Sequence, residues 1–92
     1  MRIYLAGKVA GEPNYREIFS EAAEKLRMEG HEVYNPAAAN QGGREVSDIM
    51  AHHLPQLCYS EAVALLPNWK TSGGSAVECH LAQYLGKEII YL

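Results

Sequence analysis

The sequence predicts an α/β fold of the flavodoxin or Rossmann kind: a three-layer sandwich with a four-stranded parallel sheet, order 2-1-3-4, and helices on both faces. Short apolar runs typical of buried strands alternate along the chain with segments of helical periodicity. Glycine and proline turns separate them, and no repeat or linker interrupts the 92 residues. Such alternation with short turns favours a parallel sheet covered on both sides. We expect a single domain over residues 1–92.

The first third of the chain predicts a strand and a helix. The β-prone run Arg2–Ala6 is the first expected strand, and Gly7 ends it. A helix is expected from Asn14, a good capping residue with Glu17 three positions later as its capping-box partner, to Gly30. The apolar residues of this helix share one face: Tyr15, Ile18, Phe19, Ala22 and Leu26.

The middle third predicts a strand, a loop and a second helix. The strand His31–Tyr34 is stopped by Asn35-Pro36. Residues 37–44 are small, polar and Gly-rich, which predicts a surface loop. Ser47 or Asp48 is then expected to cap a helix. The apolar positions of that helix are Ile49, Met50, Leu54 and Leu57.

The last third completes the sheet. Pro55 lies inside the second helical pattern, so we expect that helix to kink or to split in two. A strand, a helix and a strand are then expected at Glu61–Leu66, Ser75–Leu85 and Glu88–Leu92. Ligands of such sheets bind at the carboxyl ends of the strands, where the strand order reverses. The loops Gly7–Gly11 and Pro67–Glu78 are therefore expected to face each other across one crevice, with Tyr4 beside them.

The composition excludes several classes of partner. Eight Lys and Arg against eleven Asp and Glu form no basic stripe, which argues against a nucleic-acid polymer. No apolar stretch approaches the ~20 residues of a membrane span, and Met1-Arg2 leads straight into a strand without a signal peptide. We therefore expect a cytoplasmic protein with no membrane partner. Cys58 and Cys79 follow no metal or redox spacing and are expected to be small buried hydrophobic residues. The small core favours a homodimer or larger homo-oligomer.

The most informative segment is Thr71–Glu78, a Gly/Ser-rich loop that leads from a strand into a helix. Exposed backbone N–H groups and the helix dipole favour a phosphate at such a point. Glu78 has two interpretations. The spacing Ser75-x-x-Glu78 is that of a capping box, whereas a carboxylate at the mouth of a phosphate-sized cradle can act as nucleophile or base. The spacing alone favours the cap and leaves both interpretations open.

Other polar and aromatic residues also have two interpretations. Tyr4 either belongs to the core or hydrogen-bonds a carboxylate in the crevice. Trp69 either stacks on a ligand base or covers its own loop. His52 and His53 are adjacent, so on a helix they point roughly 100° apart and only one can face the crevice. Cys79 and His80 lack the spacing of a zinc site, so no metal is predicted.

Three segments carry a resemblance to a known family. They are Ile3–Gly7, Leu66–Gly74 and Ala76–Ala82, the last leading to Leu85-Gly86-Lys87. In order and spacing they resemble the nucleoside 2-deoxyribosyltransferase family, whose superfamily includes the 2′-deoxynucleoside 5′-phosphate N-hydrolases. The likeness covers nearly the whole chain, and its Leu-Pro-x-Trp-x-x-Ser stretch is most similar to short uncharacterised members.

The resemblance implies roles for residues around the reacting bond. Glu78 matches the nucleophile that attacks the anomeric carbon of the sugar, and Tyr4 matches the tyrosine that orients it. Gly7 and Lys8 fall in the loop beside the sugar and the phosphate. His53 falls where the family keeps an aspartate that handles the proton of the departing base, and an imidazole can serve there as general acid.

The resemblance also implies a phosphate site. Ser72 falls where the deoxyribosyltransferases keep an aspartate near the sugar 5′ oxygen and where the nucleotide hydrolases have a serine. An aspartate would repel a 5′-phosphate, whereas a serine with the following amides can donate to it. The phosphate-binding residues are then Lys8, Ser72, Gly74 and Ser75, with Trp69 near the base.

Together these residues predict an N-glycosidase or base-exchange transferase acting on a (deoxy)nucleoside 5′-monophosphate. Its partner is a small-molecule nucleoside or nucleotide, and neither a metal nor an organic cofactor is implied. The alternative is a catalytically silent nucleotide-binding module of the same fold, and a third possibility is a structural subunit in which Glu78 only caps its helix. Active relatives often lend residues beyond the last strand to a neighbouring subunit. This chain stops at Leu92, so any shared site is expected to be built differently.

Overall fold

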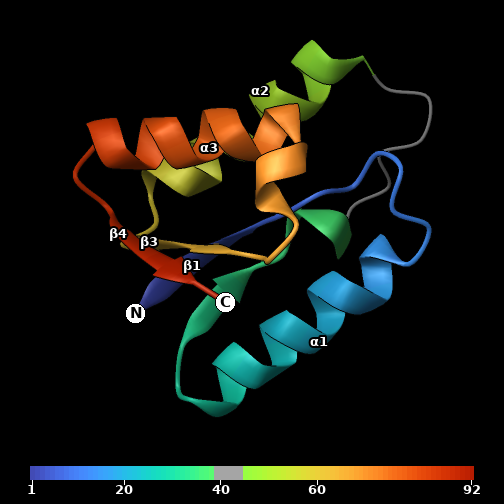
Figure 1. Ribbon diagram of the computed structural model, residues 1–92. Helices are drawn as coiled ribbons and strands as arrows, with labels where there is room; N and C mark the ends of the chain where they lie inside the picture. The colour runs from blue at the N-terminus through green and yellow to red at the C-terminus, as the bar shows by residue number, and fades with distance from the viewer. Residues whose placement is uncertain (39–44) are drawn as a thin grey trace.

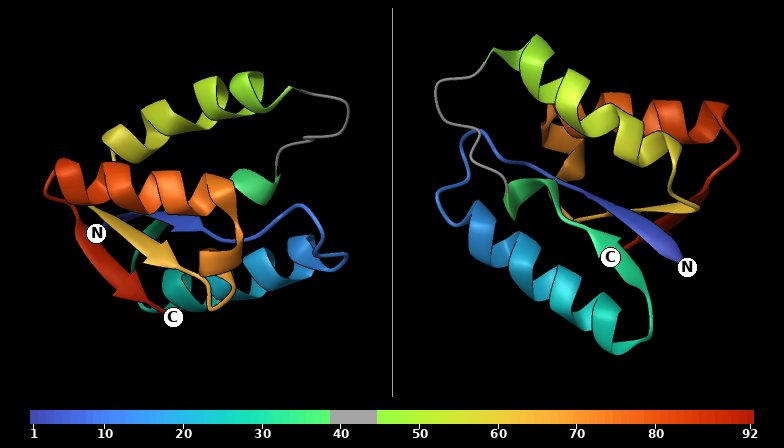
Figure 2. Two further views of the ribbon diagram at one scale, coloured as in Figure 1. Left: turned by 45° about the horizontal axis from the view of Figure 1, so that its top comes forward. Right: turned by 180° about the vertical axis from the view of Figure 1, so that it is seen from behind.

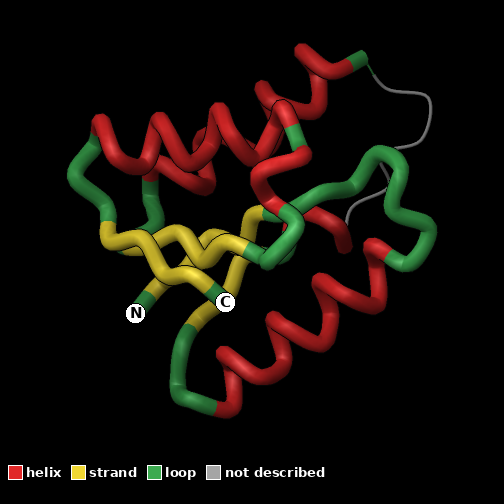
Figure 3. The backbone as a smooth tube through the Cα atoms, in the orientation of Figure 1, coloured by secondary structure: helices red, strands yellow, loops and turns green. Residues whose placement is uncertain are grey.

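The computed structural model describes residues 1–38 and 45–92. Within these ranges strands and helices alternate along the chain, as the tube drawing in Figure 3 shows. The strands are β1 (Arg2–Ala6), β2 (Glu32–Tyr34), β3 (Ala62–Leu65) and β4 (Glu88–Tyr91). The helices are α1 (Tyr15–Met28), α2 (Val46–Cys58) and α3 (Gly73–Tyr84).

The four strands form one parallel sheet in the order β2-β1-β3-β4. Helix α1 covers one face of this sheet, and α2 and α3 lie side by side on the other (Figures 1 and 2). The predicted three-layer α/β fold and its strand order are therefore confirmed. In the register of the sheet, Tyr4 of the central strand β1 lies between Tyr34 of β2 and Val63 of β3.

Alternation along the strands divides the buried residues into two clusters. Successive side chains of a strand point to opposite faces, so Ile3 and Leu5 pack toward α1. Tyr4 and Ala6 pack toward α2 and α3. The continuous burial of β1 from Ile3 to Ala6 follows from its central position, because both of its faces are covered.

The first helix confirms both expected ends but not the predicted capping box. Gly30 follows α1 with φ of 95°, the left-handed conformation that a glycine past the C-cap adopts readily. Asn14 does occupy the N-cap, but its side chain makes no capping hydrogen bond within the described part of the chain. The capping box expected between Asn14 and Glu17 is therefore wrong, because the Asn14 backbone lies at φ −100°, ψ 22° and not in the extended region typical of a cap.

The second helix begins earlier than expected and continues further. Its N-cap is Glu45, so Ser47 and Asp48 lie inside the first turn, and their expected position as the cap is wrong. The helix runs unbroken through Pro55, which corrects the expectation of a split. Burial of Leu57 beyond the proline stabilises the last turn, because tertiary packing holds helices that local sequence disfavours. Pro36–Ala38 forms a 3₁₀ turn, and the rest of the loop expected over residues 37–44 lies outside the described residues.

Two further expectations from composition can be compared with the structure. Cys79 is buried in the α2/α3-facing cluster, as expected, whereas Cys58 is exposed at the last residue of α2, so its expected burial is wrong. Over residues 1–38 and 45–92, the helices are too short or too polar to cross a bilayer.

Candidate functional site

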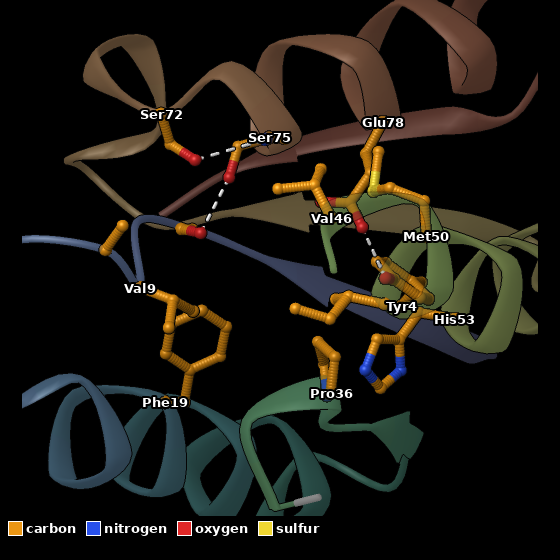
Figure 4. Close-up of a pocket in the computed structure, with 14 residues that line it drawn as sticks. Tyr4, Val9, Phe19, Pro36, Val46, Met50, His53, Ser72, Ser75 and Glu78 are labelled. Atoms are coloured by element: carbon orange, nitrogen blue, oxygen red, sulfur yellow. Dashed lines mark hydrogen bonds between the residues drawn. The ribbon is translucent and has the colours of Figure 1, made fainter. Parts of the chain in front are cut away.

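A cavity of about 320 Å³ lies at the carboxyl edge of the sheet, beside the ends of β1 and β3 (Figure 4). This volume is at the lower end of the range of small-molecule sites. The loop after β1 faces the beginning of α3 across the cavity, as predicted. The wall is mostly apolar, and the polar side chains are few: Tyr4, His53, Ser72, Ser75 and Glu78.

Glu78 and Tyr4 form a buried pair in this cavity. The Tyr4 hydroxyl donates a hydrogen bond to Oε2 of Glu78, and the two side chains point toward each other in Figure 4. Glu78 is 8% exposed and Tyr4 is fully buried. Tyr4 belongs to β1 and Glu78 to α3, so the fold brings together two residues that are 74 positions apart in the sequence.

The surroundings change the acidity of both groups. Burial raises the pKa of Glu78 from 4.5 to about 7, and the hydrogen bond from Tyr4 acts in the opposite direction. Burial, and then the negative charge of Glu78, raises the pKa of Tyr4 far above its ordinary value. Tyr4 therefore stays protonated and remains a donor, while Glu78 exchanges its proton near neutral pH. A perturbed carboxyl group in a cavity is typical of functional sites.

Glu78 does not cap its helix. Helix α3 begins at Gly73, and its N-cap is Ser72, whose Oγ accepts a hydrogen bond from the Ser75 N–H at 3.2 Å. Glu78 lies six residues after this cap, beyond the reach of the first free N–H groups. The capping box expected from Ser75-x-x-Glu78 is therefore wrong, because the helix starts two residues earlier than the sequence predicted. The carboxyl group turns to Tyr4 instead.

Ser75 has a structural contact of its own. Its hydroxyl donates to the carbonyl oxygen of Gly7 at 2.7 Å, so the beginning of α3 is tied to the loop that follows β1. With its single hydroxyl hydrogen and its N–H both used, Ser75 has no donor left for a phosphate. The groups that remain for an anion are the Ser72 hydroxyl hydrogen and the N–H groups of Gly73 and Gly74 in the first turn.

Gly7 lets this loop lie close to the next strand. A Cβ atom at this position would lie 2.5 Å from Cδ1 and 2.9 Å from Cβ of Leu66, closer than side-chain packing allows. Leu66 is itself fixed, because its N–H donates to the Ala6 carbonyl at 2.8 Å. A side chain at position 7 would therefore push the loop that follows β1 away from Leu66, which directly follows β3.

His53 is the second titratable side chain in the cavity wall. It lies on the sheet-facing side of α2, is 3% exposed, and its Nδ1 lies 2.8 Å from the Tyr34 hydroxyl. The neighbouring His52 is exposed, so only one of the two histidines faces the crevice, as predicted. His53 of α2 and Glu78 of α3 therefore line the same cavity (Figure 4).

Tyr34 is a residue of this site that sequence reasoning missed. It stacks on Tyr4 with ring centroids 5.5 Å apart and an interplanar angle of 20°, and it contacts His53 through its hydroxyl. The sequence shows a tyrosine at the end of the second predicted strand but does not give the register of that strand. Aligned from their first residues, the predicted strands Arg2–Ala6 and His31–Tyr34 would pair Tyr4 with Val33, whereas the structure pairs Tyr4 with Tyr34.

Two predicted substrate-binding residues lie elsewhere. Lys8 is not part of the cavity wall; its N–H donates to Oδ1 of Asn68 at 3.1 Å, which joins the two loops. Trp69 packs toward Tyr91, with ring centroids 6.4 Å apart, and does not line the cavity either. Trp69 thus packs against β4 and the buried cluster that faces α2 and α3, and its stacking on a ligand base stays a prediction. Among residues 1–38 and 45–92, no three potential ligands are grouped as a metal site would require.

Comparisons with known proteins agree with this architecture. Residues 1–91 match a family model described as a domain of unknown function, DUF4406. A search of curated proteins found no match. Among solved structures, the chain is similar to a 2-deoxyribosyltransferase from the psychrotolerant bacterium Bacillus psychrosaccharolyticus, with a TM-score of 0.77 and 22% sequence identity. The similarity covers 99% of this chain and 71% of that one, and at this identity it shows a shared fold.

Proposed function

Because this chain belongs to the DUF4406 family and has the fold of a 2-deoxyribosyltransferase, we propose that it cleaves the N-glycosidic bond of a (deoxy)nucleoside 5′-monophosphate. The sugar phosphate is released to water or transferred to a second base. One observation carries the proposal: the buried Glu78 carboxyl, held by Tyr4, in a cavity at the carboxyl edge of the sheet. The carboxyl is not needed as a helix cap, since Ser72 fills that role.

In the proposed first step, the Glu78 carboxylate attacks C1′ of the sugar. The bond between C1′ and the base nitrogen breaks, and its electron pair leaves with the base. His53 gives its proton to the departing base, which leaves as a neutral molecule. Tyr4 keeps one carboxylate oxygen in place, so that the other is free to form the glycosyl ester.

In the second step, water or another base attacks C1′ from the face that the first base left. The ester bond to Glu78 breaks, and the carboxylate is restored. His53 takes the proton of the attacking water, which returns both groups to their starting states. Two displacements at C1′ retain the configuration of the sugar, as in retaining glycosidases.

In this proposal the 5′-phosphate binds at the beginning of α3. Ser72 and Gly74 line the cavity at this end of the helix, and the Ser72 hydroxyl and the N–H groups of the first turn would donate to the phosphate, with the helix dipole adding to the attraction. Ser75 supports this site through its bond to Gly7 and does not itself bind the phosphate. Lys8 and Trp69 are left out of the proposed site, since neither lines the cavity.

The test is incubation with a panel of nucleosides and nucleoside monophosphates, followed by chromatography for free bases. Glu78→Gln keeps the shape of the side chain but not the nucleophile, so kcat should fall by about 10³-fold or more. Glu24→Gln, at an exposed position of α1, is the matched control and should keep full activity.

Two results would contradict the proposal. If Glu78→Gln releases base at the wild-type rate, Glu78 is not the nucleophile. If the wild type binds nucleotides, seen as a rise in melting temperature, but releases no base from any of them, the protein is a nucleotide-binding module without catalysis.

A further inference from the structure

Tyr34 lies behind the cavity and contacts both sides of the proposed machinery. It is the last residue of β2, is partly buried, and is absent from the cavity wall. One of its neighbours is Tyr4, which holds Glu78, and the other is His53. Any role of Tyr34 in the reaction must therefore pass through these two side chains.

The first contact fixes the ring of Tyr4. The two rings are nearly parallel, 20° apart, with centroids at 5.5 Å, and the backbones of the two residues are paired in the sheet. Offset stacking of this kind stabilises a relative orientation of two aromatic rings. Since the Tyr4 hydroxyl lies in the plane of its ring, the stack also sets the direction in which it meets Glu78.

The second contact fixes the ring of His53. The Tyr34 hydroxyl lies 2.8 Å from Nδ1 and donates or accepts according to the tautomer of the imidazole. This contact holds one nitrogen of the imidazole and so limits rotation of the His53 ring. The ring of Tyr34 also meets that of His53 edge to face, with centroids 5.8 Å apart.

We propose that Tyr34 is a positioning residue that aligns the partner of the nucleophile, Tyr4, with the proton donor, His53. The inference rests on the proposed glycosidase function and adds a residue to it. The ring of Tyr34 acts on the nucleophile side, and its hydroxyl acts on the proton-transfer side. The two effects can therefore be separated by removing the hydroxyl alone.

Tyr34→Phe removes the hydroxyl and keeps the stack on Tyr4. A misaligned general acid loses part of its usual contribution of about 10²- to 10⁴-fold, so kcat on ordinary nucleotides should fall roughly 10-fold or more. The KM should change less than about 2-fold, because Tyr34 does not touch the substrate. Tyr84→Phe, at a residue that is 84% exposed on α3, is the matched control and should behave as the wild type.

Leaving-group dependence separates positioning from a general loss of structure. In a nitrophenyl glycoside of the sugar phosphate the leaving group is nitrophenolate, which departs as a stable anion and needs no proton. Tyr34→Phe should therefore cleave this substrate within about 2-fold of the wild-type rate. In a His53→Ala background, Tyr34→Phe should cause no further loss, since the hydroxyl acts through the imidazole. Two results would overturn the inference. One is an equal loss of kcat in Tyr34→Phe on the nucleotide and on the nitrophenyl substrate. The other is a loss from Tyr34→Phe in the His53→Ala background as large as in the wild type.

A spectroscopic measurement tests the contact without relying on activity. The ¹⁵N shift of His53 Nδ1 should be that of a hydrogen-bonded nitrogen in the wild type and should change in Tyr34→Phe, with no change in Tyr84→Phe. A wild-type Nδ1 shift typical of a nitrogen without a hydrogen bond would overturn the inference even if the variant failed to fold. If the wild type releases base and depends on Glu78, but Tyr34→Phe matches it, only the inference on Tyr34 fails. If the wild type releases no base, the proposed function fails and the inference falls with it.

Discussion

The two faces of the sheet carry different kinds of buried side chain. Toward α1 the core is built from apolar side chains such as Ile3, Leu5 and Phe19, and in residues 1–38 and 45–92 no buried polar side chain belongs to α1. Toward α2 and α3, the buried set includes Tyr4, His53, Ser75 and Glu78. Alternation along β1 alone sends Ile3 to one side and Tyr4 to the other.

This difference separates stability from chemistry. Burial of apolar surface is the main favourable term in folding, and the α1 face supplies it through side chains such as Ile3, Leu5 and Phe19. A buried carboxyl group costs free energy whenever it is charged. The chain therefore places Glu78 on the face where Tyr4 can hydrogen-bond it, and the α1 face offsets the cost.

The largest expected effect is on the α1 face. Leu5→Ala removes a fully buried side chain and should lower the free energy of unfolding by about 2–5 kcal/mol. Because Leu5 does not line the cavity, the molecules that remain folded should keep the wild-type activity. The measurement is urea unfolding beside base release per folded molecule. Ile3→Val, expected to cost only about 0.5–1.5 kcal/mol, provides a milder step at the same face. If either variant lost activity under conditions where it is fully folded, the α1 face would also shape the site.

The second effect is on the other face, where Glu78 links stability to pH. Its pKa is about 7 in the folded chain and 4.5 without burial, so the folded state binds the proton more tightly. The free energy of unfolding should fall as pH rises from about 4.5 to about 7, by about 3 kcal/mol in total. Glu78→Gln cannot titrate and should lack this part of the pH dependence. Urea unfolding at pH 5 and pH 8 measures the difference.

The control for this measurement is Glu24→Gln, which removes an exposed carboxyl group from α1. It should keep the wild-type slope between pH 5 and pH 8. If Glu78→Gln kept that slope as well, the carboxyl would not be the group that links stability to pH, and the contrast between the two faces would lose its energetic basis.

The fold was predictable because its pattern is periodic. Apolar runs and helical faces repeat along the whole chain, and a strand such as Arg2–Ala6 is recognised from its own residues. Helix starts were less predictable, because two serines near the beginning of α3 compete for the cap. Ser72 fills it, and so Ser75 and Glu78 are released for other contacts.

The residues of the candidate site were predictable where they belong to strands or helices, and not where they belong to loops. Tyr4, His53 and Glu78 come from regular elements, whose faces the period of a strand or a helix sets, and all three line one cavity. Lys8 and Trp69 come from loops, where side-chain direction depends on contacts such as that of Trp69 with Tyr91. Their expected place beside a substrate followed from position in the sequence, which does not determine where a loop side chain points.

The smallest expected effect is that of the Tyr4 hydroxyl, and it tests whether the polar face acts as a unit. The hydrogen bond from Tyr4 lowers the pKa of Glu78 against the effect of burial. Tyr4→Phe keeps the stack on Tyr34 and removes that bond, so the pKa of Glu78 should rise above about 7. Because the nucleophile must be ionised, the acid limb of the kcat/KM profile should move to higher pH by about one unit, or ~1.4 kcal/mol.

The pH profile decides between two roles of this hydroxyl. If Tyr4 only tunes the charge of Glu78, the ratio of variant to wild-type kcat/KM should be low below pH 7 and should rise toward one at higher pH, where Glu78 is ionised in both proteins. If Tyr4 also holds the carboxylate in line with C1′, kcat should stay low at every pH. Tyr84→Phe, which removes an exposed hydroxyl from α3, should leave the profile in place. An unshifted acid limb with full activity in Tyr4→Phe would mean that Glu78 is ionised independently of its partner, and the polar face would then be a set of separate residues.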